Sequence, residues 1–303
     1  MAGSSYLSYF KVAPKLCHNN KYTVECRIGY SKPKATIMLS QRPKSPALLG
    51  DYLPMAILTD SYKATHFLQY PPAKKMVAYG EFRTGFDNDK SDCRIVWYGI
   101  RYIIEHHVSK RWTIQEIDKV DAFYATHMAP GHGKFPYPRE LFLRFIKEHN
   151  GYMPVKIEIL PEGTCVHPHV PVFQITAEEP YAPLCTFLET LLVQAWYPST
   201  VATLSRRIKT VLAEAFDVSV DQGRKSPLLH SRLHDFGFRG CTCVEQSVLG
   251  GVAHLLSFKG SDTMSAAYYA QFGLNEGRPV ASSIPATEHS VMTSWPSGKP
   301  SCK

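Results

Sequence analysis

The segment LHDFGFRGCTC, at positions 233–243, combines residue types that suit a small-molecule site. It places an aromatic ring, Phe236, three residues before a guanidinium, Arg239. A Phe face can stack on a planar ring, and the planar fork of Arg can grip two phosphate oxygens at once. Gly237 and Gly240 let the backbone approach a ligand closely, and a helix starting soon afterwards would offer free amide donors to an anion. The mixture predicts a nucleotide-like ligand; a structural loop with a core Phe and a salt-bridged Arg is the competing interpretation.

Three polar residues recur at a fixed distance along the C-terminal half. Asp235, Asp262 and His289 lie 27 residues apart at each step, and each precedes a helical pattern. Short apolar runs accompany them, and the expected strands end near Asp235 and cover 255–258 and 280–284. One strand, one loop and one helix take about 30 residues, and active sites of parallel barrels lie at the carboxyl ends of the strands. The spacing therefore predicts α/β architecture with these residues at one edge.

Each of these polar residues also has a structural interpretation. Asp262 could accept hydrogen bonds from an amide or a hydroxyl, but Asp before a helix is a preferred N-cap, and the same holds for Asp60. His289 could act as a base or a phosphate acceptor, or be a structural histidine. The spacings of Cys165, His167 and His169, and of His234 with Cys241 and Cys243, match no usual zinc site, so no protein-held metal is expected.

The elements around these residues are predicted from their periodicity. A helix begins after Asp60 and ends before Pro71, and another covers about 98–107. A strand at 155–159 and a second alternating run at 165–175 predict a β-hairpin. Helical patterns follow at 183–195, 201–216 and 244–254. We expect a basic extension at 1–50, a mixed α/β N-terminal domain at 51–180 and a C-terminal α/β domain at 181–303.

The charge of the chain is concentrated at its start. Of the net charge of +8 over 303 residues, +7 falls within 1–50, which hold eight Lys and Arg against one Glu. The remainder is almost neutral, so a nucleic-acid partner is not expected. No run reaches the roughly 18 apolar residues of a membrane span. The eight scattered Cys favour an intracellular, cytoplasmic protein with free thiols, and 1–50 have the composition of either an organelle-targeting segment or a disordered tail.

Long motifs in the chain resemble the nicotinamide phosphoribosyltransferase family. They are ILTDSYKATHFLQYPP, VWYGIRYII, LETLLVQAWYPSTVAT, LHDFGFRG, FKGSDT and SIPATEHSVMTSW, in the family's order, from about Pro54 to Trp295. The resemblance implies an enzyme that makes nicotinamide mononucleotide from nicotinamide and phosphoribosyl pyrophosphate, with Mg²⁺, coupled to ATP hydrolysis. It also implies a homodimer whose dimer-forming elements lie in the mixed N-terminal domain with antiparallel strands, at 51–180. Residues 181–303 would then be the first, truncated part of a catalytic domain, an incomplete, irregular α/β barrel of the type II phosphoribosyltransferase kind.

The resemblance assigns roles to residues that match the family's motifs. Phe236 would stack on the nicotinamide ring, Arg239 would bind phosphate and Asp262 would accept from the carboxamide. His289 would be phosphorylated by ATP and help to hold pyrophosphate, and Tyr62 would reach the ring from the other subunit. The remaining substrate-binding residues would be Ser283, Ile284, Ala286, Asp60 and His234.

The chain departs from the family's pattern at both ends. Family members continue well past the motif that ends at Trp295, and 1–50 have no counterpart in them. The expectation is a truncated chain whose own activity is doubtful. Two alternatives stay open: a non-catalytic subunit that dimerises with a full-length enzyme, and a nicotinate-preferring enzyme. Asp262 argues against a preference for nicotinate, because its carboxylate would repel the carboxylate of nicotinate.

Overall fold

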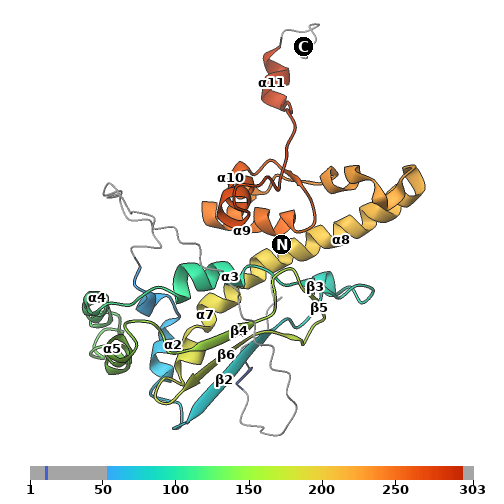
Figure 1. Cartoon of the computed structure of the whole chain (residues 1–303). Coiled ribbons are helices and arrows are strands. Elements are labelled where there is room, and N and C mark those ends of the chain that lie inside the picture. The colour runs from blue at the N-terminus through green and yellow to red at the C-terminus, as the bar shows by residue number, and fades with distance from the viewer. Residues whose placement is uncertain (1–10, 13–52, 296–303) are drawn as a thin grey trace. The chain divides into compact units, whose positions relative to one another are not determined.

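The computed structural model describes residues 11–12 and 53–295, which form two compact units (Figure 1). Unit 1 extends to Thr203, and unit 2 begins at Leu204. Apart from Lys11–Val12, the basic extension predicted over 1–50 lies outside the described residues. The predicted catalytic domain starts at 181, whereas the helices between 184 and 203 belong to unit 1.

Unit 1 is built on a four-stranded antiparallel sheet. Its order is β1 (Lys11–Val12), β2 (Lys75–Glu81), β6 (Pro171–Glu178) and β4 (Lys156–Ile159), and Figure 1 shows the last three as neighbouring arrows. In β6, runs of two or three buried residues are separated by single exposed ones, and Val172 and Ile175 are fully buried. This pattern fits a sheet that is covered on at least one face.

The predicted hairpin is wrong in one respect. The run at 165–175 forms two strands, because Cys165–Val166 (β5) pairs with Ile95–Val96 (β3) in a separate sheet. The extended conformation is interrupted at His169, which has a φ of 65°. The next strand, β6, then pairs with β4. Left-handed backbone at His169 and the prolines on either side interrupt the alternation.

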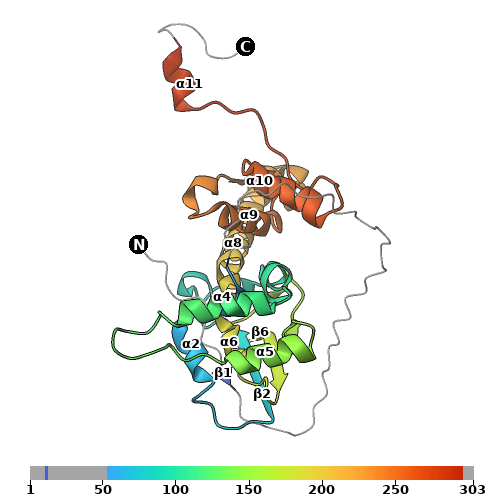
Figure 2. The same ribbon diagram turned by 90° about the vertical axis from the view of Figure 1, so that its left-hand side faces the viewer.

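The helices of unit 1 enclose one aromatic core. Trp112 packs edge-on against Phe142 and Phe145, with 5.0 Å between ring centroids in each pair. The predicted helices are confirmed at Ser61–His66 and near 98–107. The helical elements are η1 (Met55–Ile57), α2 (Ser61–His66), η2 (Phe86–Asn88), α3 (Ile100–Ile103), η3 (Ile104–Val108), α4 (Ile114–Tyr124), α5 (Arg139–Glu148), α6 (Leu184–Phe187), α7 (Glu189–Leu192) and η4 (Val193–Ala195). Helices α4 and α5 lie side by side in Figures 1 and 2. Because Leu184, Leu188 and Leu192 are fully buried in this core, the segment after 181 folds with unit 1.

Unit 2 alternates short parallel strands with helices. Strand β7 (His234–Asp235) pairs in parallel with β8 (Gly260–Ser261), and Gly260 forms a parallel bridge to Ser282. The helical elements are α8 (Trp196–Ser219), which begins in unit 1, η5 (Gly223–Lys225), η6 (Pro227–Ser231), η7 (Phe238–Gly240), α9 (Val244–Leu255), α10 (Met264–Tyr268), η8 (Tyr269–Leu274) and α11 (His289–Ser294). This order agrees with the predicted α/β class.

Two strand positions differ from the prediction. The run expected as a strand at 255–258 instead lies at the end of α9 and the turn after it, and the strand forms at Gly260–Ser261. The run at 280–284 contributes a single bridge at Ser282. A buried histidine explains the first shift. His254 Nε2 donates to Gly260 O (3.0 Å) and its Nδ1 forms a hydrogen bond with Ser205 Oγ (2.9 Å), which holds the end of α9 against β8.

Within 53–295, no helix has both the length and the apolar character needed to cross a membrane.

Candidate functional site

The carboxyl ends of β7 and β8 bring the predicted polar residues of unit 2 together. The amide of Asp262 donates to the carbonyl of Asp235 (2.9 Å), and the amide of Ser261 donates to the carbonyl of Ser282 (3.0 Å). The loop after β7 carries Phe236, and Asp262 directly follows β8. Parallel pairing thus places Asp235, Asp262 and the Ser282 segment at one edge, where ligands of α/β sheets bind.

The carboxylate of Asp262 has two partners. Ser283 Oγ donates to Oδ1, and His234 Nδ1 lies 3.6 Å from Oδ2. The helix that follows, α10, has Thr263 at its N-cap position without a side-chain capping bond. Asp262 is therefore not a helix cap. Its side chain is 27% exposed, so the carboxylate is reachable by a small ligand.

The loop after β7 presents an aromatic face and a free cation. Phe236 is 69% exposed, and its ring lies nearly parallel to that of His234, with 6.1 Å between centroids. Gly237 N donates to Asp235 Oδ1 (2.7 Å), which fixes the turn. Arg239 is exposed in η7, and its guanidinium makes no ion pair or hydrogen bond within 53–295. The salt-bridged interpretation of Arg239 is thereby not supported.

Gly251, which was not among the predicted site residues, lets α9 approach the site. A Cβ on Gly251 would lie 2.8 Å from Asp235 Oδ2 and 2.4 Å from Ala266 Cβ. Asp235 Oδ2 is buried and has no hydrogen-bond partner among the described residues. The signal was present in the sequence, since two adjacent glycines inside a helical pattern indicate a packing or functional cause.

His289 stands apart from these residues. It is the first residue of α11, it is exposed, and Glu288 occupies the N-cap position. Among the described residues, no hydrogen bond or ion pair joins its side chain to another predicted site residue. Ile284 and Ala286, in the segment leading to α11, are also exposed.

In unit 1, Tyr62 is held with its ring toward solvent. It is 55% exposed, and its hydroxyl donates to Asp60 Oδ2 (3.3 Å), which also accepts from Thr190 Oγ1 (3.2 Å). Partial burial and the Asp60 carboxylate raise the pKa of Tyr62 above its ordinary value. Asp60 sits at the N-cap of α2 but makes no side-chain capping bond. Thr190 was not predicted, and no sequence pattern indicates its contact with Asp60.

Several of the residues considered for zinc have other partners. His167 Nδ1 lies 3.3 Å from Cys93 Sγ, and His169 Nδ1 lies 3.3 Å from Glu81 Oε1. Cys243 Sγ accepts from Gln246 N at the start of α9. No group of three or more His, Cys, Asp or Glu in the described part of the chain is arranged to hold a metal.

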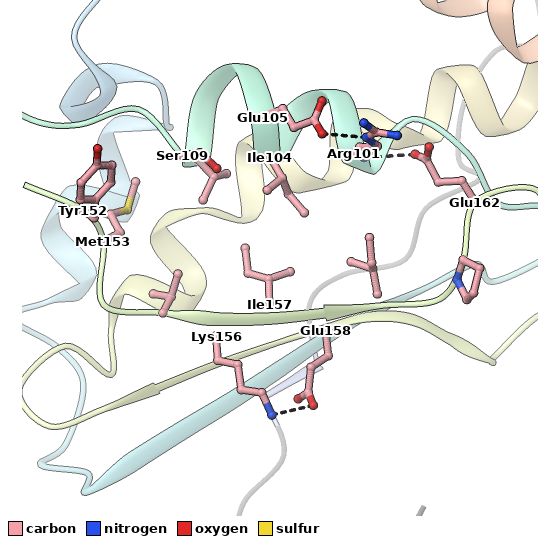
Figure 3. Close-up of a pocket in the computed structure, with 14 residues that line it drawn as sticks. Arg101, Ile104, Glu105, Ser109, Tyr152, Met153, Lys156, Ile157, Glu158 and Glu162 are labelled. Atoms are coloured by element: carbon pink, nitrogen blue, oxygen red, sulfur yellow. Dashed lines mark hydrogen bonds and ion pairs between the residues drawn. The ribbon is translucent and has the colours of Figure 1, made fainter. Parts of the chain in front are cut away.

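A separate groove of about 990 Å³ lies in unit 1 between β4 and the α3–η3 segment (Figure 3). Ile157 points toward Ile104 across it, while Lys156 and Glu158 point away and pair with each other. At one end, Arg101 Nε donates to Glu105 Oε1 (2.7 Å). The groove contains none of the predicted site residues.

Two family models match separate parts of the chain. Residues 54–157 match "Nicotinamide phosphoribosyltransferase, N-terminal domain", and 231–299 match the "Nicotinate phosphoribosyltransferase (NAPRTase) family". The second match covers the β7–β8 edge and all of the predicted site residues of unit 2.

The chain is also similar to proteins named nicotinamide phosphoribosyltransferase. The chain is 35% identical over 240 residues to a nicotinamide phosphoribosyltransferase of Xanthomonas campestris, covering 78% of this chain and 48% of that protein. It is 31% identical over 246 residues to one of Acinetobacter baylyi, covering 77% and 47%. The chain therefore spans about half the length of these relatives.

The fold is similar to a solved structure, the crystal structure of human nicotinic acid phosphoribosyltransferase. The TM-score is 0.51 at 20% identity, over 78% of this chain and 40% of the other. This similarity supports the mixed α/β class. The predicted resemblance to the nicotinamide phosphoribosyltransferase family is therefore confirmed by both family models and by these relatives.

Proposed function

We propose that the chain binds nicotinamide at the carboxyl edge of β7 and β8 and serves the transfer of the phosphoribosyl group from phosphoribosyl pyrophosphate to it, giving nicotinamide mononucleotide and pyrophosphate. The observation that carries this proposal is the Asp262 carboxylate. It is reachable, it is not a helix cap, and Ser283 and His234 hold it one residue beyond β8, beside the loop of Phe236. A fixed carboxylate is a good acceptor for an amide NH₂.

The residues of the loop after β7 suit the rest of the substrate pair. The exposed ring of Phe236 would stack on the pyridine ring, which contributes about 0.5–1.5 kcal/mol beyond area burial. The guanidinium of Arg239, which has no ion pair or hydrogen bond with the described residues, would bind phosphate oxygens in a bidentate manner. Holding the ring nitrogen against the sugar carbon turns an encounter of two molecules into a reaction within one complex.

The bond changes define what the site must stabilise. The ring nitrogen bonds to the ribose carbon, and the bond from that carbon to pyrophosphate breaks with its electron pair leaving on pyrophosphate. Positive charge moves to the pyridine ring and negative charge accumulates on the leaving group. Arg239 would stabilise the leaving group electrostatically. Mg²⁺ would arrive with the pyrophosphate, since it binds through substrate phosphates and only one or two carboxylates.

Several features implied by the resemblance complete the proposal. The parallel β7–β8 pair would be part of a type II phosphoribosyltransferase barrel. His289 would accept phosphate from ATP, and Ile284 and Ala286 would line the pocket. Tyr62, held by Asp60, would close on the ring from a second subunit in a homodimer. The protein would act in the cytoplasm.

The test measures binding first, since binding does not depend on turnover. Titration of the 303-residue chain with nicotinamide is expected to release heat and saturate, and nicotinate is expected to bind more weakly. With phosphoribosyl pyrophosphate and Mg²⁺ added, chromatography identifies any mononucleotide formed. Arg239→Ala should weaken phosphoribosyl pyrophosphate binding, whereas Arg232→Ala, at an exposed arginine outside the loop, should not.

The outcomes separate the three functions. Tighter binding of nicotinate would make the chain a nicotinate enzyme. Dimerisation with a full-length homologue without nicotinamide binding would make it a non-catalytic subunit.

A further inference from the structure

The ring of His234 is fixed by the backbone of the neighbouring strand. His234 pairs with Gly260 in the parallel ladder. A Cβ on Gly260 would lie 2.4 Å from Cδ2 and 2.7 Å from Nε2 of the imidazole. The ring therefore lies directly on the backbone of β8, in a space that only glycine leaves open. The ring of Phe236 lies nearly parallel to the imidazole, with 6.1 Å between centroids.

This placement directs one ring nitrogen at Asp262. Nδ1 lies 3.6 Å from Asp262 Oδ2, which is within ion-pairing range and slightly longer than a hydrogen bond. The His234 side chain is 16% exposed and that of Asp262 is 27% exposed. Such contacts commonly shorten when a ligand fills the site. Ser283 occupies the other carboxylate oxygen, so the two partners together fix the plane of the carboxylate.

We infer that His234 is a positioning residue that sets the preference for a carboxamide over a carboxylate, acting through Asp262. In its neutral tautomer with the proton on Nδ1, His234 donates to Asp262 Oδ2, so the pair of side chains carries one negative charge, on Asp262. That charge accepts from the NH₂ of a pyridine carboxamide and repels a pyridine carboxylate. The inference rests on the proposed function for its ligand.

The first arm of the test needs no ligand. Long-range ¹H–¹⁵N spectra of the ¹⁵N-histidine-labelled chain report the tautomer of each of its 13 histidines, and His234→Asn assigns the signal. We expect a proton on Nδ1 of His234 and a shift of that signal in Asp262→Asn. A proton on Nε2 alone, or a signal that ignores Asp262→Asn, overturns the inference.

The second arm compares two substitutions by titration calorimetry. His234→Phe keeps a flat ring against Gly260 but removes both nitrogens. It should weaken nicotinamide binding by about tenfold and reduce the ratio of nicotinamide to nicotinate affinity. His234→Asn retains an N–H donor near the position of Nδ1 and should bind within about twofold of the original chain.

The failures of the two proposals are distinguishable. If the unaltered chain binds nicotinamide and His234→Phe binds it equally well, the role of His234 is wrong and the proposed function stands. If the unaltered chain binds no nicotinamide, the proposed function is wrong, and the role of His234 in specificity is wrong as well.

Discussion

At the scale of single residues, the site is defined by which side chains already have hydrogen-bond partners and which remain exposed to a ligand. The carboxylate of Asp262 is fixed by Ser283, whereas the ring of Phe236 and the guanidinium of Arg239 are exposed. Residue types and the 27-residue spacing predicted Asp262 at a strand end. The sequence could not decide between a cap and an acceptor, because both need an Asp before a helix. The structure excludes the cap, because Thr263 occupies the N-cap position of α10 and the Asp262 carboxylate accepts instead from Ser283 Oγ.

Phe236→Ala tests the aromatic contact. Removing the ring should weaken nicotinamide binding by about 1–3 kcal/mol through lost stacking and buried area, and should leave binding of phosphoribosyl pyrophosphate unchanged. Calorimetry with each ligand measures both effects. Phe238→Ala is the matched control, because Phe238 is exposed in the same loop. Equal losses in both variants would remove Phe236 from the ligand site.

At the scale of elements, the sequence predicted the type of most segments and misplaced their ends. The strand expected at 255–258 forms at Gly260–Ser261, because the contacts of His254 with Ser205 and Gly260 keep the end of α9 against the strand. The expected hairpin strand at 165–175 divides where the backbone of His169 turns left-handed. Both outcomes depend on contacts between distant segments, which periodicity does not report.

Gly251→Ala tests the close approach of α9 to β7. Alanine favours a helix over glycine by about 1 kcal/mol, but its Cβ would collide with Ala266 and Asp235 Oδ2. We expect a net loss of about 1–3 kcal/mol, seen as a lower midpoint in thermal unfolding. Gly240→Ala should have little effect on stability, since a Cβ there meets nothing within 4 Å. A higher midpoint for Gly251→Ala would contradict this packing.

His254 should make unit 2 sensitive to acid. Burial lowers the pKa of His254 below its ordinary value of 6.5. The unfolded chain therefore binds the proton more readily, so stability is full above pH 6.5 and falls as the pH drops toward the folded-state pKa. Thermal midpoints measured between pH 7.5 and 5 should fall less steeply in His254→Gln. In His132→Gln, at an exposed position, the slope should match that of the original chain; equal slopes in all three would exclude His254 as the source.

At the scale of the whole molecule, the sequence predicted a mixed N-terminal region and a C-terminal region of parallel βα units, and the structure shows both. It also predicted a break near 181, whereas the compact units divide at Thr203. The reason is that α6 and α7 carry helical periodicity but bury their apolar residues in the core of unit 1. A change from strands to helices is visible in a sequence, but the core to which a helix belongs is not.

The proposed homodimer predicts complementation between two defective chains. Tyr62→Ala and Phe236→Ala should each weaken nicotinamide binding when measured alone. If Tyr62 acts across a two-fold interface, mixing them at equal amounts with subunit exchange should restore about one site in four, because half of the dimers are mixed and each has one intact site. Fluorescence-detected stoichiometry counts these sites. No recovery in a mixture that exchanges subunits would place Tyr62 outside the partner's site.

The most direct measurement is the ratio of nicotinamide to nicotinate affinity, by calorimetry, in the original chain and in Asp262→Asn. We expect the original chain to favour nicotinamide and Asp262→Asn to narrow the affinity ratio by about tenfold or more, because the charge that repels the nicotinate carboxylate is gone. Asp221→Asn, at an exposed position of unit 2, should keep the original ratio. An original chain that favours nicotinate, or a ratio unchanged in Asp262→Asn, would contradict the assignment of the β7–β8 edge as a carboxamide site.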